Sequence, residues 1–173
     1  MHNSIESKAS EMLEYTYYES PIGALLIAGR GDVLRLISFP EGSKVRRPLP
    51  GWVYVGKPFE EAIRQLRAYF ARELRRFDLP LQPCGTPFQL AVWRELQRIP
   101  YGETITYGEL AQRAGNPKGS RAVGAANGCN PLPIVIPCHR VIGSNGNLTG
   151  FGGGLGVKQM LLDLETGRKP LLP

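Results

Sequence analysis

Short runs of hydrophobic and polar residues in the first part of the chain follow the spacing of strands. Three such runs, rich in β-branched and aromatic residues, lie between Tyr15 and Phe39. Two turn signals separate them, Ser20-Pro21-Ile22-Gly23 and Gly29-Arg30-Gly31-Asp32. We therefore expect an antiparallel meander of three strands with the role of a scaffold.

The next two segments predict a loop and then a helix. Pro40 to Pro58 is rich in proline, glycine and basic residues, which favours a loop. From Phe59 to Phe77 apolar residues recur at helical spacing. They form one stripe, made of Phe59, Ala62, Ile63, Leu66, Tyr69, Phe70, Leu74 and Phe77. The arginines off this stripe could contact phosphate, but a solvated face is the commoner explanation.

Asp78 to Gly85 contains two prolines and a glycine and predicts the boundary between two parts of the chain. We expect an N-terminal scaffold domain over residues 1–80, a linker over 81–85 and a second domain over 86–173. The fold class is α+β: a small antiparallel sheet with a helix, followed by a winged helix-turn-helix domain.

The second domain carries helix-start signals. Thr86 and Thr106 are each followed three residues later by Gln or Glu, the capping-box pattern. Asn116, followed by Pro117, predicts the cap of a third helix. Two short helices across a tight Gly-Asn turn predict a helix-turn-helix.

After these helices, the sequence predicts a hairpin turn at Asn145-Gly146 and a glycine-rich loop over Gly150 to Gly156. A final helix is expected from Lys158 to Glu165, ended by Gly167.

The second helix of the helix-turn-helix is made almost entirely of small residues. Arg121 to Asn127 reads Arg-Ala-Val-Gly-Ala-Ala-Asn. This face could pack on a neighbouring helix, or it could enter a narrow groove. The DNA minor groove is only about 6 Å wide, and base reading in the major groove needs longer polar side chains. We therefore favour binding to DNA that is independent of base sequence.

Composition narrows the classes of protein. The chain has 173 residues and a formal net charge of +6, which is compatible with nucleic acid. No run is long enough to cross a membrane, and the polar start does not resemble a secretory signal. Three cysteines and two histidines show no metal-ligand spacing, so we expect no metal, no disulfide framework and a reducing compartment. The expected location is the cytoplasm, or the nucleus of a eukaryote.

The clearest chemical signal is Pro137-Cys138-His139-Arg140-Val141, which follows the apolar run Ile134 to Ile136. Pro137 should end or turn a segment, which would present Cys138 at the rim of the core. A thiolate is the reactive form of cysteine, and His139 is a candidate base. Adjacent side chains diverge, so His139 would reach the sulfur across a bend or through a water. A buried cysteine beside a core histidine is the alternative for this pair alone.

This pentapeptide, with Asn130-Pro131 before it and the glycine-rich segment after it, resembles the acceptor site of the O6-alkylguanine-DNA alkyltransferase family. The resemblance runs from about Thr86 to Glu165. It implies that Cys138 is the alkyl acceptor and that Glu165 orients His139 in a relay through water. It also implies that Asn130 braces the turn.

The same resemblance implies residues that contact DNA or the damaged base. Arg121 would fill the gap that an extruded nucleotide leaves, and the Tyr107 hydroxyl would donate to the base. Further candidate contacts are Asn116, Ser144, Val141 and Gly152. Many family members have tyrosine where this chain has Phe151, and serine or another side chain where it has Gly152, so the loop of this chain could act only through its backbone amides.

The expected function is repair of double-stranded DNA by direct reversal: a single, irreversible transfer of an alkyl group from guanine O6 to Cys138 after base flipping. O4-alkylthymine is a further candidate substrate. A thioether is not hydrolysed at neutral pH, so we expect one turnover and no cofactor. The resemblance implies binding in the minor groove, and we expect a monomer. The alternatives are a non-catalytic binder of alkyl lesions, a winged-helix regulator and a cysteine hydrolase.

Overall fold

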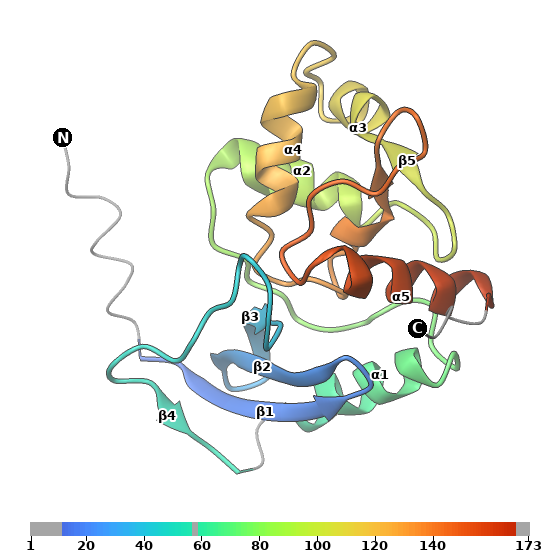
Figure 1. Ribbon diagram of the computed structural model, residues 1–173. Helices are drawn as coiled ribbons and strands as arrows, with labels where there is room; N and C mark the ends of the chain where they lie inside the picture. Colours follow the sequence, from blue (N-terminus) through green and yellow to red (C-terminus); the bar gives the residue numbers. More distant parts are fainter. Residues whose placement is uncertain (1–11, 57–58, 169–173) are drawn as a thin grey trace, which may run out of the picture.

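The computed structural model describes residues 12–56 and 59–168. Its N-terminal half contains a four-stranded sheet in the order β3-β2-β1-β4 (Figure 1). The strands are β1 (Glu14–Ser20), β2 (Gly23–Arg30), β3 (Val33–Ser38) and β4 (Val53–Tyr54). The first three form the predicted antiparallel meander. The fourth lies in the segment that we interpreted as loop, and it pairs in parallel with β1.

Strand β2 is buried on both faces, which explains why β4 is present. Leu25 and Ile27 belong to the main core. Leu26 and Ala28 face the other way, into a small second cluster against which Trp52 packs. Trp52 thus anchors the chain beside β1 just before β4 begins.

Helix α1 (Glu60–Phe70) packs against the main core through the predicted apolar stripe, but it ends seven residues earlier than we expected. After Phe70 the chain turns, and Arg72 takes a left-handed backbone (φ 63°). The left-handed position that ends a helix usually holds glycine, so the sequence contained no signal for this end.

The helix-turn-helix region follows the sequence closely, with one correction. Helix α2 (Pro87–Leu96) and helix α3 (Tyr107–Arg113) both begin with the predicted capping boxes, at Thr86 and Thr106. Helix α4 (Ser120–Gly128) begins later than expected, with Gly119 as its cap. Asn116 does not cap it. Asn116 instead forms a tight turn in which its carbonyl accepts from the Gly119 amide (2.8 Å).

The remaining elements are β5 (Ile105–Thr106), the short 3₁₀ helix η2 (Cys138–Arg140), β6 (Val141–Ile142) and α5 (Leu155–Thr166). Strands β5 and β6 pair in parallel. Asn145 and Gly146 do form a turn, but no hairpin strand follows it within the described residues. Helix α5 begins three residues before the expected start and ends at Gly167, which has a left-handed backbone.

The outer edge of β3 connects the two halves of the chain. Its Leu34 amide donates to the Pro80 carbonyl (2.9 Å), and its Ile37 amide donates to the Pro131 carbonyl (2.8 Å). One core cluster contains residues from both halves, and α5 lies between the sheet and the helices α2 to α4 (Figure 1). The observed architecture confirms the α+β class, while the domain limits at residues 80 and 86 stay a prediction.

Candidate active site

The acceptor turn begins where the buried run Ile134 to Ile136 ends. This run forms a turn, and Ile134 has a left-handed backbone (φ 75°), which is uncommon for a β-branched residue. Pro137 precedes the 3₁₀ helix that carries Cys138. Such strained positions often occur at functional sites.

Cys138 is 5% exposed and lines a cavity of about 40 Å³. The cavity walls come from the end of β3, the following loop, the end of α4 and the glycine-rich loop: Ile37, Ser38, Phe39, Lys44, Arg46, Asn127, Gly128, Asn130, Pro133, Gly150, Phe151 and Gly152. Ligand sites usually measure about 300–1,000 Å³. A purine therefore fits only if walls of this cavity separate.

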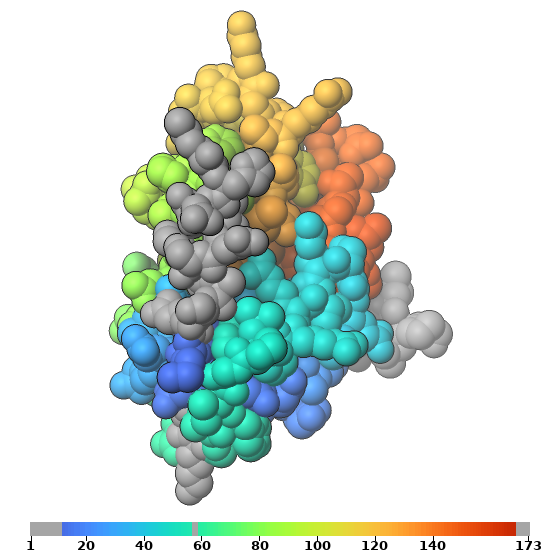
Figure 2. Space-filling view, turned by 90° about the vertical axis from the view of Figure 1, so that its left-hand side faces the viewer, coloured from blue at the N-terminus to red at the C-terminus, as the bar shows by residue number. Residues whose placement is uncertain are grey.

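Two of these walls come from opposite halves of the chain. The Lys44 amide donates to the Gly152 carbonyl (3.3 Å). A Cβ at Gly152 would meet the Lys44 side chain at 2.9 Å, so the missing side chain permits this approach. In Figure 2 the teal N-terminal loop reaches the orange C-terminal segments. Gly152 therefore contributes close backbone packing at the mouth of the cavity.

His139 and Glu165 form a fully buried pair. Nε2 of His139 lies 2.7 Å from Oε1 of Glu165, and neither side chain has exposed surface. The other ring nitrogen, Nδ1, has no hydrogen-bond partner among the described residues. Burial lowers the pKa of His139, while the hydrogen bond that the ring donates to Glu165 acts in the opposite direction. The ring is therefore neutral at rest, and Nδ1 is free to take a proton.

The Glu165 carboxylate collects donors from several elements. Arg140 donates through Nε to Oε2 and through Nη2 to Oε1, both at 2.9 Å. The Gly102 amide donates to Oε2 (3.0 Å) and the Tyr69 hydroxyl to Oε1 (2.8 Å). Burial alone would raise the pKa of Glu165, but the hydrogen bonds from His139 and Arg140 outweigh it and hold the pKa well below its usual range. The carboxylate is charged at neutral pH.

Burial raises the pKa of the Cys138 thiol to about 11, although Asn130 and Lys158 oppose the shift. The resting thiol is thus neutral at pH 7. Lys158 is completely buried, and its ammonium donates to the carbonyls of Val141 (2.6 Å) and Thr149 (3.0 Å). It places a positive charge near the sulfur and joins the acceptor segment to the glycine-rich loop.

Two asparagines fix the backbone around the sulfur. Nδ2 of Asn130 donates to the Ile136 carbonyl (2.7 Å), and its Oδ1 accepts from the Leu132 amide (3.0 Å). Asn127, which the sequence reading did not single out, donates to the Cys138 carbonyl (3.4 Å). These hydrogen bonds fix the backbone before Cys138 and at Cys138 itself.

The exposed surface of α4 lies outside this cluster. Arg121, Ala122, Ala125 and Gly128 are all exposed, so one face of the helix presents small side chains with an arginine at its start. Gly124 faces inward, and a Cβ there would meet the Tyr107 ring at 3.6 Å. Thus part of the small-residue pattern serves packing and part forms an open face.

The structure separates the predicted residues into two groups. Cys138, His139, Glu165 and Asn130 lie together. Arg121 and Ser144 are exposed, and Asn116 is half-buried. Tyr107 is half-buried, and its hydroxyl lies 3.5 Å from the Thr149 carbonyl. The Val141 side chain is fully buried, so only its backbone is available for a contact.

Four residues of the site were missed by sequence reasoning: Tyr69, Asn127, Arg140 and Lys158. Tyr69 was read as part of an apolar stripe, and Lys158 as the start of a helix. Only Arg140, inside the acceptor pentapeptide, carried a usable signal. Over the described ranges, no helix is long and apolar enough to cross a membrane. No group of three or more His, Cys, Asp or Glu side chains in those ranges could hold a metal ion.

Comparison with known proteins gives consistent matches along the chain. Residues 13–83 match the family described as 6-O-methylguanine DNA methyltransferase, ribonuclease-like domain. Residues 87–167 match the DNA binding domain of the same name. A Methanosarcina acetivorans protein named methylated-DNA–protein-cysteine methyltransferase is 54% identical over 151 residues, covering 87% of this chain and 97% of the relative.

Two mycobacterial proteins are also similar. A Mycolicibacterium paratuberculosis protein of the same name is 51% identical over 159 residues, covering 92% of this chain and 96% of the relative. The crystal structure of Mycobacterium tuberculosis OGT in complex with DNA superimposes with a TM-score of 0.86 at 48% identity. That match covers 91% of this chain and 96% of the other.

Proposed function

The chain belongs to the 6-O-methylguanine DNA methyltransferase family, and on this basis we propose that it repairs DNA by moving an alkyl group from guanine O6 to its own Cys138. It is a methylated-DNA–protein-cysteine S-methyltransferase that acts once. The observation that carries the assignment to Cys138 is the sulfur at the cavity wall beside a buried His139-Glu165 pair.

The proposed reaction begins from a neutral thiol. A water passes the Cys138 proton to Nδ1 of His139, and the Glu165 carboxylate stabilises the resulting imidazolium. The sulfur attacks the alkyl carbon in line, so that a C–S bond forms as the C–O bond breaks. The electron pair of the broken bond stays on guanine, which recovers a proton. The Tyr107 hydroxyl donates to the departing base, and no cofactor takes part.

The high pKa of the resting thiol serves selectivity in this scheme. At pH 7 only about one thiol in ten thousand would be ionised if the pKa is four units higher. Cys138 thus reacts slowly with alkylating agents that approach it from solution. A flipped alkylguanine in the cavity instead holds its alkyl carbon close to the sulfur, which offsets the low reactivity of the thiol.

The partner is DNA, and we propose that the exposed face of α4 enters the minor groove. Ala122, Ala125 and Gly128 leave room for close approach without reading bases. Arg121, at the start of this face, fills the gap left by the flipped nucleotide. Asn116 and Ser144 contact the backbone, and Val141 and Gly152 offer backbone groups to the base. We further propose a monomer that acts where cellular DNA lies, the cytoplasm in the bacteria and archaea that hold its relatives.

A lesion binder without chemistry is not favoured, because the chain retains Cys138 and its similar relatives are named as methyltransferases. The deciding experiment mixes the protein with duplex DNA containing O6-methylguanine and maps the product by mass spectrometry. We expect one methyl group per protein, on Cys138. Repeated turnover, or DNA binding without label, would refute the proposal. Cys138→Ser should lose transfer but keep DNA affinity. A parallel duplex with O4-methylthymine tests the second substrate.

Gap filling by Arg121 has a separate test. Arg121→Ala should slow repair of duplex DNA more than it slows reaction with free O6-benzylguanine, because only the duplex requires a nucleotide to be held out. Equal slowing with both substrates would assign Arg121 another role.

A further inference from the structure

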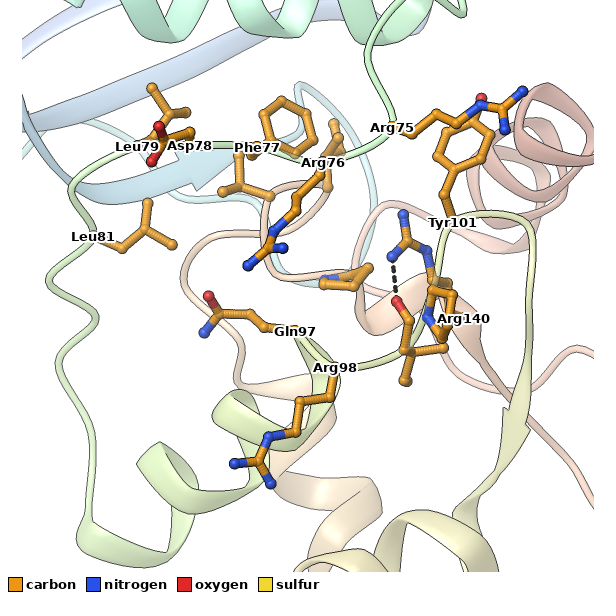
Figure 3. Close-up of a pocket in the computed structure, with 15 residues that line it drawn as sticks. Arg75, Arg76, Phe77, Asp78, Leu79, Leu81, Gln97, Arg98, Tyr101 and Arg140 are labelled. Atoms are coloured by element: carbon orange, nitrogen blue, oxygen red, sulfur yellow. Dashed lines mark hydrogen bonds between the residues drawn. The ribbon is translucent and has the colours of Figure 1, made fainter.

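A second and larger hollow is lined in part by residues of the acceptor turn (Figure 3). It measures about 540 Å³ and shares no lining residue with the cavity at Cys138. Its walls come from the segment after α1, the end of α2 and the acceptor turn, including Pro137 and Arg140. This volume falls within the usual range for small-molecule sites, about 300–1,000 Å³.

Positive charge surrounds the hollow. Arg75, Arg76 and Arg98 line it and are exposed, whereas Asp78 is the only acidic residue of its lining. Arg98 is paired with Glu95 (2.7 Å). No ion pair joins Arg75 or Arg76 to any described residue. Arg75 lies over the Tyr101 ring, 5.8 Å from its centroid, and Arg76 points into the hollow (Figure 3).

Part of the lining is apolar. The apolar residues include Phe77, Leu79, Leu81, Ile99, Ile134, Val135 and Pro137. A guanidinium rim suits phosphate, to which it can donate two parallel hydrogen bonds. An apolar lining with aromatic and guanidinium planes suits a flat base.

We propose that this arginine hollow (Arg75, Arg76 and Arg98 over the apolar lining) binds one nucleotide unit. Its base lies on the apolar lining and its phosphate at Arg75 and Arg76. The hollow is too small for a duplex, because the major groove of DNA alone is about 12 Å wide. The ligand is therefore either a free nucleotide or an unpaired nucleotide at a DNA end.

The test titrates the full-length protein with deoxyguanosine monophosphate by calorimetry. We expect saturable binding that Arg76→Ala weakens about tenfold, equivalent to about 1.4 kcal/mol. Lys44→Ala, at the Cys138 cavity, is the matched control and should leave the affinity unchanged. Three results would overturn the proposal: no binding at millimolar nucleotide, equal affinity for inorganic phosphate alone, or sensitivity to Lys44→Ala in place of Arg76→Ala.

Two further titrations identify the source of the nucleotide. If it is a DNA end, a duplex with one unpaired 5′-phosphorylated nucleotide should bind more tightly than a blunt duplex, and Arg76→Ala should remove the difference. If the two duplexes bind equally while the monophosphate binds, the ligand is a free nucleotide.

An independent observation concerns Tyr69, which lies in the N-terminal half. Its hydroxyl donates to Oε1 of Glu165 (2.8 Å), the same oxygen that lies 2.7 Å from His139. Tyr69 is completely buried, and its ring contacts those of Phe77 and Tyr101. Burial and the charge of Glu165 raise the pKa of Tyr69 well above its usual value. The hydroxyl therefore stays a donor over the whole working pH range.

We infer that Tyr69 is a positioning residue for the alkyl transfer, setting how strongly Glu165 supports protonated His139; this inference rests on the proposed function. Without the hydroxyl, Oε1 carries more negative charge and favours the imidazolium. As the pH falls, His139 of the variant therefore becomes protonated at a higher pH than His139 of the unmodified protein. Tyr69→Phe should thus move the acid limb of the pH–rate profile upward and slow transfer at the acid end of the profile, where His139 is already protonated before the reaction.

Tyr101→Phe is the matched control, because no described residue bonds to its hydroxyl, and its profile should stay in place. A slower Tyr69→Phe protein with an unchanged profile would reduce Tyr69 to a structural role and overturn the inference. Absence of transfer in the unmodified protein would instead refute the proposed function itself.

Discussion

Replacing Glu165 by glutamine keeps the side chain's size and removes its charge. The carboxylate accepts from Tyr69, Gly102 and Arg140 and contacts His139, with no exposed surface of its own. The amide of glutamine would bring two donors to a site already crowded with donors. Arg140, whose side chain is only 7% exposed, would lose its anionic partner and keep neutral acceptors, the new amide oxygen and the Ile99 carbonyl (2.6 Å).

The size of the effect follows from this uncompensated charge. Removing one partner of a buried ion pair costs about 3–5 kcal/mol. We therefore expect the free energy of unfolding of Glu165→Gln to fall by about this amount at pH 7. The matched control is Glu61→Gln, whose carboxylate pairs with Arg64 at the surface (2.6 Å). Solvent screens that pair, so the control should lose far less stability.

The stability difference should also depend on pH in a defined direction. The pKa of Glu165 is lower in the folded than in the unfolded protein. Its contribution is therefore fully present above the unfolded value of about 4.3 and is lost as the pH falls below it. The two proteins should converge in stability in acid.

Urea unfolding followed by tryptophan fluorescence measures these quantities, and Trp93, 1% exposed, is a suitable reporter. The reasoning would be refuted if Glu165→Gln cost no more stability than Glu61→Gln, or if the difference grew toward low pH. In a single-turnover assay the variant should also transfer methyl more slowly, because an amide supports the imidazolium poorly.

Three further changes test other parts of the structure. Thr86→Ala removes the capping hydrogen bond of α2 and should cost about 1 kcal/mol in urea unfolding; an unchanged midpoint would contradict the capping role. Lys158→Met leaves the Val141 carbonyl without the lysine donor, which should reduce the free energy of unfolding by about 1–3 kcal/mol and lower Tm. A higher Tm would mean that desolvation of the buried ammonium destabilises the fold by more than its two hydrogen bonds stabilise it. Iodoacetamide at pH 7 should label exposed Cys84 well before Cys138, as read by peptide mass spectrometry. Labelling of Cys138 should become faster as the pH rises toward 11. Equal labelling rates of Cys84 and Cys138 at pH 7 would contradict the raised pKa of Cys138.

Sequence patterns correctly predicted the parts of the fold that depend on residues close together in the chain. The capping boxes at Thr86 and Thr106 need only a hydroxyl and a partner three residues away, and both are present. The start of α4 was wrong because Asn116 can cap a helix or close a turn, and the choice depends on packing. Strand β4 depends on pairing with a strand more than thirty residues earlier, which no local pattern shows.

The residues of the site likewise divide into those that neighbouring sequence predicted and those that only the fold brings together. Cys138 and His139 are adjacent in sequence, so their chemistry could be read directly. Their link to Glu165 came only from the family resemblance and needed the fold to be seen. The buried Lys158 was missed because a lysine within a helix predicts an exposed position, and its two carbonyl partners belong to other segments. Tyr69 was missed because a tyrosine in an apolar stripe gives no sign of where its hydroxyl points.

The outer edge of β3 has a consequence for the protein after it has reacted. That edge is covered by backbone hydrogen bonds to Pro80 and to Pro131, seven residues before Cys138. An uncovered sheet edge is a template for pairing with other chains. A methyl group on Cys138 adds volume to close packing, and any shift of the turn that lifts Pro131 away would free the Ile37 amide. The alkylated protein would then be more prone to self-association than the unreacted protein. The fraction of insoluble protein would rise with the number of lesions repaired.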